Sequence, residues 1–141
     1  MGIDTDRVVR KCGFILEQVK ALRDLTRQLG KDAILNDPWV YRGVKYALQT
    51  AIEALVDVAY HVSAKEFAHA PTDARDALQV LRAQKVISEE DYAVYSAMVG
   101  MRNRIVHGYE TVDPERVYEV ITTGLADLER FVREITGLNY K

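Results

Sequence analysis

The stretch Met98-Val-Gly-Met-Arg-Asn-Arg-Ile-Val-His-Gly-Tyr109 lies late in a segment with helical periodicity. On a helix with about 100° per residue, Arg102 lies in the middle of an apolar stripe. An arginine keeps its proton when buried, so it needs a carboxylate, a dipole, a wet cleft or an incoming anion. The stripe consists of the residues within roughly 60° of it, namely Tyr95, Met98, Val99, Ile105, Val106 and Tyr109.

Two further polar residues lie beside this stripe. His107 is about 140° around the helix from Arg102 and about 40° from Asn103. Arg102, Asn103 and His107 are therefore expected to form a connected polar edge next to the apolar face. This edge is the candidate functional site.

The same residues resemble a known motif. Arg102-Asn103-Arg104-Ile105-Val106-His107-Gly108-Tyr109 is similar to the R-x4-H-x-Y signature of HepT-type toxins, a branch of the HEPN superfamily of small helical-bundle ribonucleases. The asparagine after the arginine, the tyrosine two residues after the histidine and the late position in a short helical chain make the match specific. The resemblance implies a helical bundle that pairs as a homodimer, with the motif helices facing each other across a cleft.

Length and composition indicate an ordinary globular protein. With 141 residues, 48% of them hydrophobic and 28% charged, residues 1–141 are expected to form a single domain with one core. The net charge of −2 gives no global attraction to RNA. Binding of nucleic acid therefore requires a local basic patch, for which Arg42, Lys45, Arg102 and Arg104 are candidates, or a small catalytic footprint.

The lone cysteine and the hydropathy pattern argue against disulfide-bonded, zinc-binding, secreted and membrane proteins. Cys12 excludes an intrachain disulfide and a cysteine-based zinc site, and its apolar neighbours predict a buried side chain. The chain shows no apolar signal core and no run of about 18 apolar residues. We therefore expect a cytoplasmic protein that does not engage a membrane.

Prolines and capping residues divide the chain into five predicted helices. Pro38, Pro71 and Pro114 each stand where a helix can begin, because proline is tolerated in the first turn and expelled from interiors. Apolar periodicity predicts helices over about 4–29, 38–64, 72–84, 88–107 and 114–135. No segment alternates with period two for long enough to form a strand. The expected fold is all-α, an up-and-down bundle of four main helices plus one shorter helix, the third.

The residue types of the motif suit RNA cleavage without a metal or other cofactor. A base must remove the proton from a ribose 2′-hydroxyl, and a cation must stabilise the charge that grows on the phosphorane. A histidine suits the first role and a guanidinium the second. The resemblance implies these roles for His107 and Arg102, with Asn103 as a polar helper and a second protomer completing the site. Without the resemblance, a buried ion pair of Arg102 and a helix-capping role of His107 explain the residues equally well.

A second polar stripe lies on the predicted second helix. Glu53, Asp57 and His61 are spaced by four residues and share one face. A metal site of this kind usually needs Glu-x-x-His motifs from two helices, which the chain lacks, so no metal is expected. A solvated face is the simplest interpretation. Glu53 and Asp57 are otherwise candidates for the carboxylate that neutralises Arg102.

Tyr109 is the candidate modification site. The resemblance implies that a cognate minimal nucleotidyltransferase antitoxin adenylylates the tyrosine of the motif. An added nucleotide places bulk and negative charge beside the cleft, which would exclude RNA.

The sequence therefore predicts a metal-independent endoribonuclease toxin of a type VII-like toxin–antitoxin pair. The alternative is a non-catalytic helical subunit that binds a nucleotide or partners a nucleotidyltransferase, because the same residues can hold a phosphate without cleaving it. The aromatic residues Trp39, Tyr41, Tyr92 and Tyr95 can stack on bases, but their helical spacing favours a core or dimer-interface role.

Overall fold

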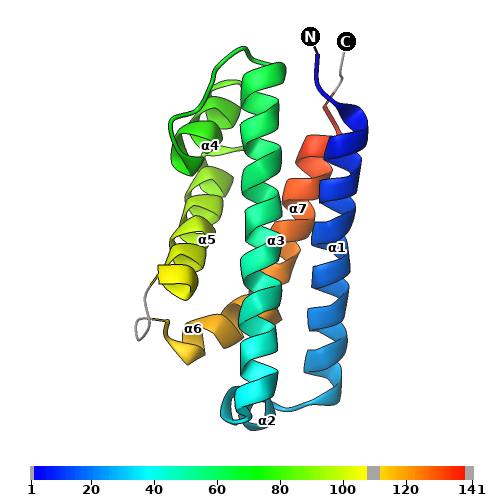
Figure 1. Cartoon of the computed structure of the whole chain (residues 1–141), viewed down its shortest axis with the longest axis vertical. Coiled ribbons are helices and arrows are strands. Elements are labelled where there is room, and N and C mark those ends of the chain that lie inside the picture. Colours follow the sequence, from blue (N-terminus) through cyan, green and yellow to red (C-terminus); the bar gives the residue numbers. More distant parts are fainter. Residues whose placement is uncertain (1, 108–111, 139–141) are drawn as a thin grey trace.

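A computed structural model of the chain, which describes residues 2–107 and 112–138, is helical and contains no strand within those ranges. The long helix α3 lies between α1 and α5, and α7 lies behind it and packs against α1 (Figure 1). The predicted all-α bundle of four main helical stretches and a shorter one between the second and third is confirmed. The elements are α1 (Thr5–Gln28), α2 (Lys31–Asn36), α3 (Pro38–Lys65), α4 (Ala74–Ala83), α5 (Glu89–His107), α6 (Pro114–Glu119), the π-helical turn η1 (Val120–Gly124) and α7 (Leu125–Thr136).

Short polar side chains set where the long helices begin. Asp4, Asp37, Asp73 and Asp113 each accept a hydrogen bond from a backbone N–H in the first turn of α1, α3, α4 and α6. Ser88 does the same for α5 through its Oγ. These bonds satisfy donors that a helix leaves unpaired at its start. The predicted starts agree with the structure because this signal is local in sequence.

The structure adds one helix that the sequence did not predict. Residues 31–36, expected to be a connection, form α2, and its Ile34 is fully buried. Six residues span less than two helical turns, so apolar periodicity cannot show there. Contacts with α3 and α6 supply the burial that stabilises this short helix.

The fifth predicted helix is interrupted by η1 rather than continuous. The hydroxyls of Thr122 and Thr123 donate to the carbonyl of Glu119, 3.2 and 2.8 Å away. These bonds compete with the α-helical pattern and widen the turn. Gly124 permits the result, since a Cβ there would lie 3.2 Å from Cγ1 of Val120.

Polar as well as apolar contacts hold α5 against α7. The ring of Tyr95 packs edge-to-face on Phe131 with centroids 5.2 Å apart, and its hydroxyl donates to Oε1 of Glu134 at 2.5 Å. Nη2 of Arg130 lies 2.9 Å from Oδ1 of the buried Asp91. A buried phenol and carboxylate require such partners. The helix that carries the motif is therefore fixed in position along its first half.

Two other expectations concern Cys12 and membranes. Cys12 is buried as predicted, and burial raises the pKa of its thiol to about 11. At neutral pH the thiol therefore stays protonated and unreactive.

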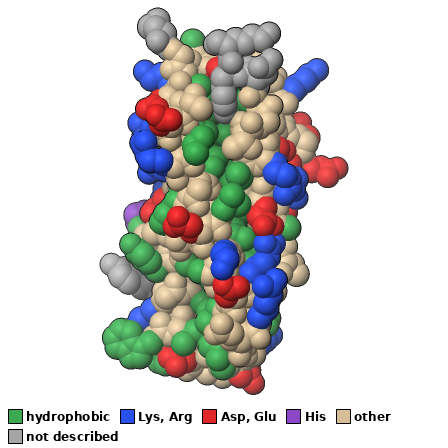
Figure 2. Space-filling view, turned by 90° about the vertical axis from the view of Figure 1, so that its right-hand side faces the viewer, with side chains coloured by type: hydrophobic (Ala, Val, Ile, Leu, Met, Phe, Trp, Pro, Cys, Tyr) green, Lys and Arg blue, Asp and Glu red, His purple; other side chains and the backbone are tan. Residues whose placement is uncertain are grey.

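Over the described ranges, none of the helices has the length and apolarity that crossing a membrane requires. On the side of the bundle that carries α1, acidic and basic side chains are interspersed (Figure 2), so no one-signed surface attracts RNA there.

Candidate functional site

Motif residues 102–107 occupy the last two turns of α5, where the helix leaves the core. Tyr95, Met98 and Val99 are buried, as the predicted apolar stripe requires, but Val106 is 40% exposed. The stripe is thus buried only over its first part. Arg102 lies where burial gives way to exposure, with 22% of its side chain accessible.

The charge of Arg102 is only partly compensated. Its Nε lies 3.7 Å from Oε2 of Glu53 on α3, and Nη1 donates to Oδ1 of Asn103 at 3.0 Å. The Nε atom is itself buried and makes no hydrogen bond within residues 2–107 and 112–138. A buried donor without a hydrogen bond is costly, so the contact with Glu53 at 3.7 Å compensates the guanidinium only in part. Of the partners considered for Arg102, namely a carboxylate, a dipole, a wet cleft or an incoming anion, the structure places the carboxylate of Glu53 next to it.

Asn103 and His107 lie on the exposed side of α5. The hydrogen bond between Arg102 and Asn103 joins two members of the predicted polar edge. His107 forms no hydrogen bond or ion pair with the described part of the chain, and its side chain is exposed. The separation of about 140° on the helix points Arg102 and His107 in different directions. Tyr109 lies outside the described residues.

The polar stripe on α3 does not form a ligand set. Glu53 pairs with Arg102, whereas Asp57 pairs with Nζ of Lys11 at 3.0 Å. His61 is buried and its Nε2 accepts a hydrogen bond from the backbone N–H of Asp4 at 2.8 Å. Burial lowers the pKa of this imidazole, which suits its role as an acceptor. The expectation of a solvated face holds only in part. His61 is buried, whereas the side chains of Glu53 and Asp57 are 38% and 47% exposed and pair with cations on α5 and α1.

The aromatic residues behave differently from one another. Tyr95 is in the core as predicted, but Trp39 is 78% exposed, so a core role is wrong for it. The guanidinium of Arg42 stacks on the Trp39 ring at 5.2 Å, and Nζ of Lys45 lies 4.7 Å from the centre of the Tyr41 ring. Such contacts stabilise exposed cations on aromatic faces. They hold two members of the predicted basic patch at the start of α3.

One functional candidate was missed. Nη2 of Arg75 on α4 donates to the carbonyl of Ser96 at 3.3 Å and lies over Gly100, beside Arg104. The only signal in the sequence was Gly100 inside the predicted helix, because a glycine within a helix often marks a place where another part of the chain packs closely against it. Nothing in the sequence indicated that Arg75 makes this approach, because α4 and α5 are separate elements.

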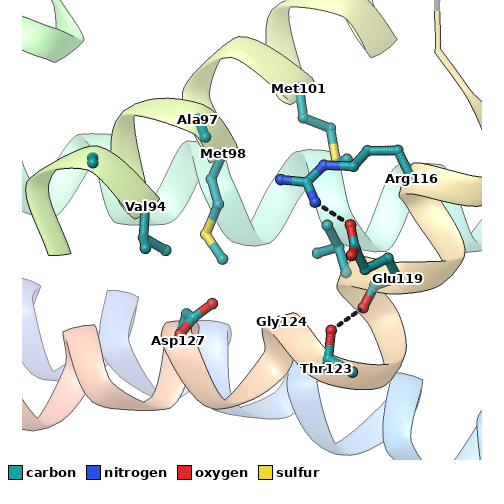
Figure 3. A pocket seen from close by; sticks show the side chains of 11 residues that line it. Val94, Ala97, Met98, Met101, Arg116, Glu119, Thr123, Gly124 and Asp127 are labelled. Atoms are coloured by element: carbon teal, nitrogen blue, oxygen red, sulfur yellow. Dashed lines mark hydrogen bonds and ion pairs between the residues drawn. The ribbon is translucent and has the colours of Figure 1, made fainter. Parts of the chain in front are cut away.

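A cavity on the other side of α5 does not involve the motif. It has a volume of about 360 Å³ and lies between α5 and the α6–η1–α7 stretch (Figure 3). Its charged lining residues are already paired, Arg116 with Glu119 and Asp127 with Arg130. Since Met98 and Met101 line it and Arg102 does not, the cavity is not part of the candidate site.

The chain is similar to known proteins over nearly its whole length. A family model described as Ribonuclease HepT-like matches residues 15–135. The mRNA nuclease HepT of Shewanella oneidensis is 26% identical over 130 residues, which are 90% of this chain and 94% of that protein. The tRNA nuclease HepT of Aphanizomenon flos-aquae is 27% identical over 90 residues, which are 64% of this chain and 61% of that protein.

A solved structure of a similar protein agrees with the fold. The tri-AMPylated HEPN toxin of Shewanella oneidensis in complex with MNT antitoxin superposes with a TM-score of 0.84 at 25% identity. The match covers 94% of this chain and 98% of that one. The resemblance predicted from residues 102–109 is thereby confirmed.

Proposed function

The chain belongs to the HepT-like family of ribonucleases, and from this premise we propose that it is an endoribonuclease toxin silenced by adenylylation of a tyrosine. The nuclease names of its two relatives and the AMPylated state of the Shewanella toxin support this assignment. The structural observation that carries it is the partly compensated guanidinium of Arg102. A cation held in this way by Glu53 and Asn103 can accept a phosphate without first releasing a strong partner.

The catalytic roles follow from the chemistry of RNA. His107 takes the proton of the 2′-hydroxyl, and the 2′-oxygen attacks the adjacent phosphorus. The 5′-oxygen then leaves with a proton from the imidazolium form of His107. The products are a 2′,3′-cyclic phosphate and a 5′-hydroxyl end. Arg102 stabilises the extra negative charge on the phosphorane, and Asn103 holds the guanidinium in position. No step requires a metal ion.

The divergence of Arg102 and His107 on one helix supports a composite site in a homodimer. Three exposed apolar side chains lie on α1, α3 and α5, the last two of which carry the ion pair of Arg102 with Glu53. Phe14 lines the same hollow as Glu53, Tyr46 lies about two turns before Glu53 on α3, and Val106 lies about one turn after Arg102. Exposed apolar residues around a polar site are typical of an interface. A second copy on this face would bring its own α5 close to the first.

Tyr109 is the proposed target of the antitoxin. It stands two residues after His107, so a nucleotide attached to its phenol places phosphate charge beside the imidazole. The expected partner is a minimal nucleotidyltransferase that uses ATP. Incubation with such an enzyme should raise the intact mass by one or more adenylyl units, and Tyr109→Phe should abolish the increase.

The deciding experiment is RNA cleavage in EDTA by the unmodified protein. The wild type should cut RNA, whereas Arg102→Ala and His107→Ala should not, although both remain folded. His69→Ala is the matched control, because His69 is also exposed but pairs with Asp76 on α4. Equal cleavage by wild type and His107→Ala would contradict the mechanism. Binding of a nucleotide with no cleavage by dimeric wild type would instead favour the non-catalytic subunit.

A further inference from the structure

Two arginines from different helices converge over one glycine of α5. A Cβ at Gly100 would lie 3.3 Å from Nη2 of Arg75 and 3.7 Å from Nη1 of Arg104. Both guanidinium ends therefore occupy the space above this glycine, which keeps the two nitrogens within about 7 Å of each other and makes their charges repel.

No acidic side chain of the described residues compensates this pair. Within residues 2–107 and 112–138, no carboxylate oxygen comes within ion-pair distance of Arg75 or Arg104. Among the described residues, the Arg75 guanidinium donates a hydrogen bond only to the carbonyl of Ser96. By contrast Arg23, Arg82 and Arg130 each pair with a carboxylate. Two adjacent exposed guanidinium groups with no carboxylate partner among the described residues can bind an anion.

The pair lies on the same side of α5 as His107. On a helix, Gly100 and His107 are within about 20° of each other, and Arg104 is about 60° from His107. The rise of a helix places Gly100 roughly 10 Å from His107 along the axis. A nucleic acid strand bound at His107 and extended toward α4 therefore passes over Gly100.

We propose that Arg75 and Arg104 form a phosphate-binding subsite that holds the RNA backbone a few nucleotides from the bond cut at His107. The inference rests on the proposed function. The two guanidinium groups donate hydrogen bonds to one phosphate from opposite sides. Because Gly100 has no side chain, there is room for both of them. This subsite supplies the local positive charge that a chain of net charge −2 needs for a polyanionic substrate.

The test measures binding of a labelled single-stranded oligoribonucleotide to His107→Ala, in which the RNA stays intact. In this background, Arg75→Ala and Arg104→Ala should each weaken binding by about fivefold at low salt. Each should also make the negative slope of log K against log salt shallower by about 0.7, the value for one phosphate contact in a single strand. The double variant should lose little more than either single one, since both arginines share a phosphate. Arg133→Ala, an exposed arginine on α7, is the control and should bind as the parent does.

Further variants separate a binding role from a structural one. With His107 intact, Arg75→Ala should raise KM for RNA more than it lowers kcat. Arg75→Lys keeps the charge and should retain the salt slope. If Arg75 only ties α4 to α5 through Ser96, Arg75→Ala lowers Tm but leaves the salt slope and KM unchanged, and this result overturns the subsite.

The remaining outcomes distinguish this inference from the proposed function. Wild-type cleavage, together with unchanged RNA affinity in the double variant, overturns the subsite and leaves the nuclease assignment intact. If wild type neither binds nor cuts RNA, both are wrong. AMP is the second probe: loss of AMP binding in the double variant with RNA binding retained would assign the two arginines to a nucleotide phosphate and overturn the RNA subsite.

Discussion

Replacing Glu53 with glutamine should slow RNA cleavage without unfolding the protein. Oε2 of Glu53 is 3.7 Å from Nε of Arg102 and accepts a weak hydrogen bond from Nε2 of Gln49 at 3.4 Å. Glu53→Gln keeps the size of the side chain but removes its charge. The guanidinium is then free to turn away from the position in which it meets the phosphate. Glu53 is thus a positioning residue that acts through Arg102.

The size of the effect follows from the exposure of the pair. Two full charges at this distance attract by about 4 kcal/mol at an effective dielectric constant near 20. The side chains of Arg102 and Glu53 are 22% and 38% exposed, so screening and lost side-chain freedom leave about 1 kcal/mol net. If all of it is expressed in the transition state, kcat falls by roughly fivefold.

The assay is steady-state cleavage of an oligoribonucleotide, with Tm measured in parallel. Glu53→Gln should lower kcat more than it raises KM, and Glu53→Asp should recover part of the loss. Asp57→Asn is the matched control, because Asp57 lies one turn further along α3 with similar exposure but pairs with Lys11. If Glu53→Gln cleaves RNA at the wild-type rate, or if Asp57→Asn loses as much activity, the positioning argument is wrong.

Three further predictions concern pH, assembly and packing. Burial and the adjacent Asp91 carboxyl raise the pKa of Glu134 from 4.5 to about 7, so its stabilising contribution is complete below pH 4.5 and is lost as pH rises through about 7. Glu134→Gln should therefore be more stable than wild type above pH 7 by about 1 kcal/mol after allowance for screening, and parallel pH profiles of the unfolding free energy would contradict this. Tyr46→Glu places a charge on a 66% exposed ring in the proposed interface and should yield monomers in light scattering; a dimer that persists would exclude this face. Leu55→Ala removes a fully buried side chain of α3 and should cost about 3 kcal/mol in chemical denaturation, whereas a loss below 1 kcal/mol would indicate a core that readily collapses.

Much of the fold was predictable because its signals are local. The caps at Asp37, Asp73, Ser88 and Asp113 mark helix starts through bonds that span two or three residues. The apolar faces between them follow from helical periodicity. The two errors in the helix assignments arose where local signals are weak. One is in the six residues of α2, and the other is in the π-helical turn, where two threonine hydroxyls donate to the carbonyl of Glu119.

The candidate site divides along the same line. The sequence by itself determined the residue types, their order along α5 and the need of a buried Arg102 for some polar or charged partner, since these depend on one helix and on the chemistry of a guanidinium. Only the tertiary structure decided that Glu53 pairs with Arg102 and that Asp57 pairs with Lys11. The two carboxylates are equivalent by spacing but face different helices. It also decided that Val106 is exposed and that Arg75 lies over Gly100. Pairings between helices depend on their relative position and rotation, which no single helix encodes.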